Sequence, residues 1–189
     1  MKPDRISLNT TWMLALTLVL ALLQGVGMAE EKDSLNEQLL QAADKGNLAR
    51  VKTLLAKSAD VNAKNHSTNT AFVIAAAKGH LEIVKLLLDH GSNVNENDYR
   101  HKTALMSASR NGNLKMVRLL VERGAQVNAA DTQGNTALME AVEGDHTTLE
   151  LTQYLLNKGA DVKQADTKMT GWFADRQLNY MRKSGKSLP

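Results

Sequence analysis

The chain has 189 residues, of which 43% are hydrophobic and 23% are charged, a composition that fits one folded domain and excludes a disordered protein. Its formal net charge is only +3 and its basic residues form no long run, so we expect no nucleic-acid binding. The sequence contains no cysteine, which excludes disulfides and metal sites with thiolate ligands.

Residues 1–29 have the pattern of a secretory signal peptide. A basic stretch precedes an apolar run over 12–23, and small residues up to Ala29 form a cleavage site before a charged segment. We therefore expect an exported mature chain over 30–189 that has no contact with the membrane. The alternative is a retained membrane anchor, although twelve apolar residues are too few to cross a hydrocarbon core about 30 Å thick.

The rest of the chain is built from a repeat with a period of 33 residues. The expected units run over about 35–64, 65–97, 98–130 and 131–165, with a C-terminal cap over 166–189. The period is carried by glycines, by leucines and by Val-Asn pairs, among them Gly46, Gly79, Gly112, Leu54, Leu87, Leu120, Asn62, Asn95 and Asn128. Units this short are stable only when neighbours stack and share one core.

The second unit shows what each repeat contains. An alanine-rich segment over 71–78 predicts a short helix that ends at Gly79. Apolar residues at helical spacing, including Leu87, then predict a second helix, and a polar stretch over 97–102 predicts an exposed turn. We expect an all-α solenoid of about four helix-turn-helix repeats plus a capping helix, with Leu87 fully buried.

Two stretches resemble the ankyrin repeat: Thr70-Ala-Phe-Val-Ile-Ala-Ala-Ala-Lys-Gly-His-Leu-Glu-Ile-Val-Lys-Leu-Leu-Leu88 and Asp131-Thr-Gln-Gly-Asn-Thr-Ala-Leu138. The resemblance extends over about 35–166. It implies a solenoid that binds other proteins through its turn tips and first helices, with no enzymatic activity and no cofactor.

The chain departs from the family pattern at several positions. The family's Thr-Pro-Leu-His motif reads Thr-Ala-Phe-Val73, Thr-Ala-Leu-Met106 and Thr-Ala-Leu-Met139. Because the family histidine helps to hold the turns by hydrogen bonds, we expect a looser turn network. The fourth unit is two residues longer than the others, near Gly144, and Trp172 is expected to cover the open end of the core.

The sequence contains no nucleophile elbow and no phosphate loop, so we expect no enzyme. His66 and His101 lie on adjacent turns, and together with Tyr99 they leave a haem- or metal-handling protein as an alternative function. Glu140 and Glu143 lie three residues apart on a predicted helix. They could receive a basic residue of a partner or form an ordinary solvated surface.

The predicted partner-binding residues occupy the turns and the positions before the inter-helix glycines, and they differ between units while the core repeats. They are His66, Ser67, Asn69, Lys78, Tyr99, Arg100, Lys102, Arg110, Asn111, Thr132, Gln133, Asn135 and Glu143. Tyr and Arg are frequent anchors of interfaces. We expect a surface that grades from basic to acidic and a partner protein with an acidic or mixed patch that docks mainly on the third unit. Ordinary solvated surface is the alternative.

These features together predict a non-enzymatic, monomeric periplasmic scaffold. Two roles are open by analogy. One is an immunity or inhibitor protein that neutralises a secreted toxin, and the other is an accessory factor in oxidant resistance.

Overall fold

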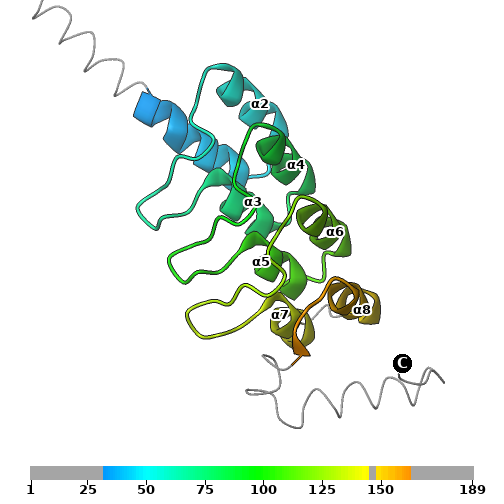
Figure 1. Cartoon of the computed structure of the whole chain (residues 1–189). Helices are drawn as coiled ribbons and strands as arrows, with labels where there is room; N and C mark the ends of the chain where they lie inside the picture. Colours follow the sequence, from blue (N-terminus) through cyan, green and yellow to red (C-terminus); the bar gives the residue numbers. More distant parts are fainter. Residues whose placement is uncertain (1–31, 145–147, 163–189) are drawn as a thin grey trace, which may run out of the picture.

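The computed structural model describes residues 32–144 and 148–162, and within them it contains helices and isolated β-bridges but no strand (Figure 1). The all-α solenoid expected from the sequence is therefore confirmed. The expected signal peptide and the C-terminal cap with Trp172 lie outside the described residues. The helices are 32–44, α2 (Leu48–Ala56), α3 (Ala71–Lys78), α4 (Leu81–Asp89), α5 (Ala104–Arg110), α6 (Leu114–Glu122), α7 (Ala137–Glu143) and α8 (Leu149–Asn157).

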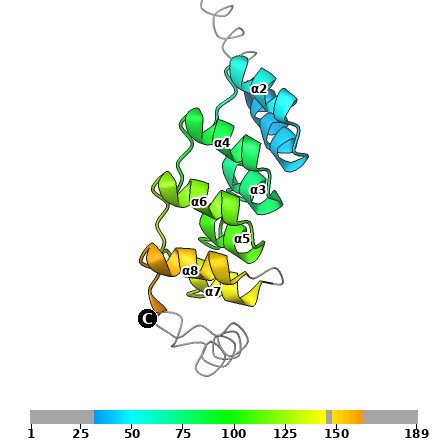
Figure 2. The same ribbon diagram turned by 90° about the vertical axis from the view of Figure 1, so that its right-hand side faces the viewer.

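The helices form two layers (Figure 2). The outer helices α2, α4, α6 and α8 stack in one row, and helix 32–44 with α3, α5 and α7 forms the inner row. The polar turns before α3, α5 and α7 project on one side of the inner row (Figure 1). In the described ranges, no helix combines the length and the apolar character that crossing a bilayer requires.

Short polar signals set the ends of the inner helices. Thr70, Thr103 and Thr136 precede α3, α5 and α7, and each hydroxyl oxygen accepts a hydrogen bond from the backbone N–H three residues later. Helix α3 ends at Gly79, whose φ of 81° places it in the left-handed region that glycine tolerates. The helix predicted over 71–78 matches α3 at both ends.

The core lies between the two layers and is mostly aliphatic. Val84, Leu87 and Leu120 from the outer helices are completely buried, as are Phe72 and Ala75 of α3. The expectation that Leu87 is fully buried is confirmed. Because each helix buries its apolar face against neighbouring units, the units stabilise one another.

The fourth unit carries its two extra residues between its helices. Five residues separate α7 from α8, whereas three separate α5 from α6. The predicted place of the insertion, near Gly144, is therefore confirmed, although residues 145–147 lie outside the described ranges.

Methionines partly replace the family histidine in the turns. The sulfur atoms of Met106 and Met139 accept hydrogen bonds from the backbone N–H groups of Thr103 and Thr136, at 3.5 and 3.4 Å. The third equivalent residue, Val73, has no acceptor atom. Two of the three turns thus keep a side-chain bond at this position, although a thioether is a weaker acceptor than imidazole. The network expected to be looser therefore keeps one weak bond in each of these two turns and none at Val73.

The asparagines of the Val-Asn pairs join adjacent units. The amide of Asn95 accepts a hydrogen bond from Gln126 N and donates one to Gly124 O, in the third unit. Asn128 makes the same pair of bonds to Asp161 N and Gly159 O. We call these two side chains the asparagine clamps. The equivalent residue of the first unit, Asn62, is exposed and makes no such bonds.

The clamps generate the first prediction. Asn95→Ala removes two hydrogen bonds between units and should lower the free energy of unfolding by about 1–2 kcal/mol. Asn62→Ala is the matched control, because it deletes the same side chain where it bonds to nothing, and should leave stability unchanged. Urea denaturation measures both, and equal losses would show that the clamps do not tie the units together.

Ser58 follows α2 in a backbone conformation that suits glycine. Its φ is 65°, and the equivalent residues after α4, α6 and α8 are Gly91, Gly124 and Gly159, with φ between 86° and 92°. A side chain in this region costs about 1–2 kcal/mol. The first unit therefore carries a local strain that the later units avoid.

The second prediction follows from this strain. Ser58→Gly should raise the free energy of unfolding by about 0.5–1 kcal/mol, the relief of strain being partly offset by the greater freedom of glycine in the unfolded chain. Gly91→Ala should lower the free energy of unfolding through backbone strain alone, since the added Cβ has no atom within 4 Å and causes no clash. Thermal denaturation tests both signs, and a loss of stability with Ser58→Gly would contradict the prediction.

Candidate partner-binding surface

The inner row carries a hollow of about 620 Å³ over the first three units. Helix 32–44, α3 and α5 line it, together with the turns before α3 and α5. Its apolar lining residues are Leu40, Val73, Ile74 and Ala77, and the rest of its lining is polar or charged. A concave surface of this volume with mixed lining can receive several side chains of a partner.

The structure separates the predicted binding residues into two groups. Asn69, Lys78, Lys102, Arg110 and Asn111 line the hollow. The remaining ones lie on the turns or at the end of α7 and do not line it: His66, Ser67, Tyr99, Arg100, Thr132, Gln133, Asn135 and Glu143.

The residues predicted from sequence include none from the first unit, because that unit lacks the turn signature of the others. Helix 32–44 supplies Glu37, Leu40, Gln41, Asp44 and Lys45 to the lining. Comparing equivalent positions of the 33-residue repeat would have identified them, since Gln41 is equivalent to the lining residues Ile74 and Ser107.

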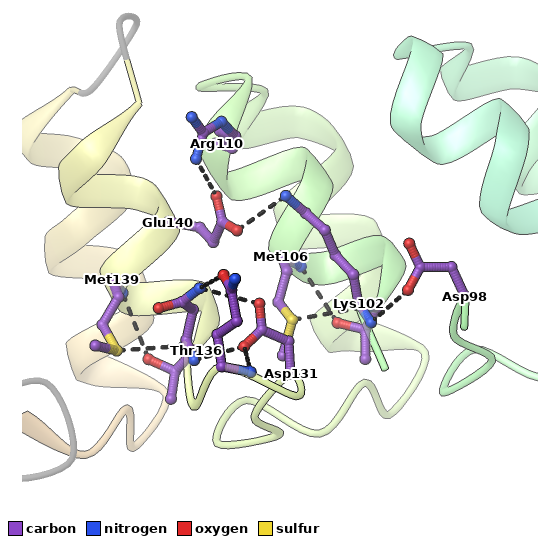
Figure 3. A network of polar contacts seen from close by, with 11 residues as sticks. Asp98, Lys102, Met106, Arg110, Asp131, Thr136, Met139 and Glu140 are labelled. Atoms are coloured by element: carbon purple, nitrogen blue, oxygen red, sulfur yellow. Dashed lines mark hydrogen bonds and ion pairs between the residues drawn. The ribbon is translucent and has the colours of Figure 1, made fainter. Parts of the chain in front are cut away.

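Ion pairs with a buried carboxylate join two lining residues of the hollow to the fourth unit (Figure 3). Glu140 of α7 is only 3% exposed. One carboxylate oxygen lies 2.9 Å from Lys102 Nζ, and the other lies 2.9 Å from Arg110 Nη1. We call these three residues the ion-pair wall.

The wall corrects two expectations. Glu140 neither lies on a solvated helix surface nor remains available to a partner's basic residue. Sequence reasoning missed this because the charges come from adjacent units and meet only after stacking. Lys102 and Arg110 share the single carboxylate of Glu140, so one net positive charge remains there, and Glu143 of the fourth unit is exposed. The predicted grading from basic to acidic stays a prediction.

Gly144 supports the wall by allowing α5 and α7 to approach closely. A Cβ atom at Gly144 would lie 2.2 Å from the backbone oxygen of Arg110, and that atom cannot move aside without shifting α5. The equivalent residue of the third unit is Asn111, so glycine is required only where the chain meets the backbone of Arg110.

The turn of the third unit presents a fixed aromatic and cationic pair. Tyr99 is 61% exposed, and Arg100 Nε donates a hydrogen bond to its hydroxyl oxygen at 2.8 Å. Asp98 Oδ1 accepts hydrogen bonds from the backbone N–H groups of Arg100 and Lys102. Thr132 N donates to Arg100 O from the next turn. We call Tyr99 and Arg100 the tip pair. These hydrogen bonds fix its backbone conformation without a partner.

Arg100 differs from the other arginines of the third unit. Arg110, Arg118 and Arg123 each pair with a carboxylate of an adjacent unit. In the described part of the chain, the Arg100 guanidinium has no carboxylate partner and lies 5.3 Å from the centre of the Tyr99 ring. It is therefore a cation available to a partner.

The histidines of the turns form no visible ligand set. His66 and His101 are exposed. Over residues 32–144 and 148–162, no group of three or more His, Asp or Glu side chains is placed to hold a metal ion.

The ion-pair wall generates the third prediction. Lys102→Met with Arg110→Met should destabilise the protein by about 3 kcal/mol, because it leaves a buried carboxylate without a partner. Glu140→Gln alone should cost less, since the side chains of Lys102 and Arg110 are 26% and 52% exposed and can turn toward water. Added to the double variant, however, Glu140→Gln should restore stability. The account would be contradicted if urea denaturation showed that Glu140→Gln changes the free energy of unfolding in the same direction in the parent protein and in the double variant.

Comparison with known proteins agrees with the stacked helix pairs and projecting turns. A family model described as ankyrin repeats (3 copies) matches residues 39–131 and 100–166. No curated protein matches the chain. Repeats of this kind indicate a scaffold for protein–protein interaction, and the family is generally non-enzymatic. With most of the chain matched and the fold in agreement, this protein belongs to the ankyrin-repeat family.

Proposed function

We propose that the protein is an exported, non-enzymatic scaffold that binds a partner protein through the tip pair and the adjacent hollow. The observation that carries the proposal is the tip pair itself. It combines an exposed tyrosine with an arginine that lacks a carboxylate partner, on a backbone fixed by hydrogen bonds.

Physical principles favour this surface as an anchor. Tyr and Arg are the residue types that most often carry binding energy at interfaces. A surface that is already ordered loses less conformational entropy when it binds. The guanidinium can still donate hydrogen bonds to a carboxylate, so the partner's contact with the tip pair is an acidic residue.

The pattern over 1–29 supports export to the periplasm, and we propose that the mature protein acts there as a monomer. Within this location the partner is either a secreted toxin that the protein neutralises or a component of oxidant resistance. Neighbouring genes distinguish these roles, since a toxin gene supports the first and a catalase gene supports the second.

The fourth prediction tests the proposed function. Cells that produce the tagged full chain are treated with a chemical cross-linker and fractionated, and cross-linked proteins are identified by mass spectrometry. Tyr99→Ala with Arg100→Ala should weaken recovery of the partner at least tenfold, a loss of about 1.4 kcal/mol, without changing the melting temperature. The cross-linked product should come from the periplasmic fraction.

The fourth unit offers a matched control. Thr132→Ala with Gln133→Ala changes the equivalent two positions of the next turn, where both side chains are also exposed. Thr132 and Gln133 are among the binding residues predicted from sequence, but the proposal places the anchor on the third unit, so this variant should retain the partner. If both double variants retain it equally, the tip pair is not the anchor.

A further inference from the structure

Asn111 is the only asparagine in the sequence that is followed by glycine. In such a pair the backbone nitrogen of the glycine can attack the carbonyl carbon of the asparagine side chain, because glycine has no side chain to shield that nitrogen. The other units carry Lys45, Lys78 and Gly144 at the equivalent position. The third unit alone therefore contains this chemically reactive pair.

The structure places Asn111 where it is both accessible and structurally useful. The residue follows α5 directly, is exposed and lines the hollow. Its Nδ2 donates a hydrogen bond to the backbone oxygen of Ala77 in the second unit, at 3.0 Å. Water thus reaches the side chain of a residue that joins two units.

Two contacts hold the pair in a geometry that does not react. Gly112 N donates a hydrogen bond to Ser109 O at 3.0 Å, and Asn111 has helical backbone angles, with φ of −77° and ψ of −1°. To form a ring, the glycine nitrogen must leave Ser109 and the asparagine side chain must leave Ala77. Both contacts lie at the end of a helix of seven residues, where local opening costs little free energy. Ring formation therefore requires that the turn between α5 and α6 opens first.

We propose that Asn111 is a site of spontaneous deamidation, controlled by local opening of this turn. A bond forms between Gly112 N and Asn111 Cγ while the bond between Cγ and Nδ2 breaks. The Nδ2 nitrogen leaves as ammonia and takes the proton of the Gly112 amide. Water then hydrolyses the resulting succinimide ring at either of its two carbonyl groups. The product is aspartate or isoaspartate, and in isoaspartate the backbone runs through the former side chain.

Either product weakens the contact between the second and third units. Both lack Nδ2, so the hydrogen bond to Ala77 O is lost. Aspartate replaces the amide with a carboxylate, which only accepts hydrogen bonds, and isoaspartate also lengthens the backbone of the turn. Both add a negative charge to the lining of the hollow. The protein is thus altered without an enzyme, at a residue that joins two units and lines the proposed binding surface.

The fifth prediction concerns the rate and the place of this reaction. The full-length protein is incubated at mildly alkaline pH, and peptide mapping by mass spectrometry follows every asparagine. Asn111 should deamidate faster than any other asparagine of the folded protein. In urea, which opens the turn permanently, its rate should rise at least tenfold. Labelling with an isoaspartyl methyltransferase should detect isoaspartate at this position.

The equivalent positions of the repeat supply a matched control. Asn111→Lys introduces the residue that the first and second units carry before their glycine, and it removes the reactive side chain. Incubation should lower the melting temperature of the parent and leave that of Asn111→Lys unchanged. Asn111→Asp reproduces one product directly and should have a lower melting temperature than the parent before any incubation.

Three outcomes would overturn the inference. If Asn111 reacts no faster than the other asparagines, it is not a preferred site. Equal rates with and without urea would show that opening of the turn does not control the reaction. An unchanged melting temperature of Asn111→Asp would show that the conversion does not weaken the contact with the second unit.

Discussion

Stacking between units is the constraint on which the structure depends. Helices α2 to α8 are seven to nine residues long, well below the length at which an isolated helix is stable in water. Each persists because its apolar face is covered by an adjacent unit, as for Leu87 and Leu120. The core must repeat for the units to stack, which leaves variation to the turns and the inner surface. The proposed binding surface is consequently the part of the chain that stacking leaves free.

The sequence predicts the repeat well because the period is a local pattern with many markers. It places the ends of α3, the burial of Leu87 and the insertion after α7 correctly. It also identifies five of the residues that line the hollow. These successes share one cause, which is that position within a unit determines position in space once the units stack.

The failures have the opposite cause, because they depend on contacts between different units. Glu140 reads as a surface residue within its own helix, and it is buried only because Lys102 and Arg110 reach it from the third unit. The contribution of helix 32–44 to the hollow is another example, since the first unit carries few family markers. Aligning the units by their period and comparing equivalent positions would have exposed both features.

The uneven placement of the asparagine clamps has a consequence for motion. The clamps tie the second unit to the third and the third to the fourth, whereas the first unit is held partly by the pair between Lys78 and Asp44, whose side chains are about half exposed. Exposed pairs of this kind contribute little to stability. His80 Nε2 also contacts the backbone oxygen of Asp44 at 3.2 Å, but no asparagine clamp joins the first two units. Among the junctions that the structure describes, we therefore expect local opening first where helix 32–44 meets α3. Residues of helix 32–44 and α3 line the hollow. We therefore expect the width of the hollow to change more easily on this side than between the second and third units, which a clamp joins.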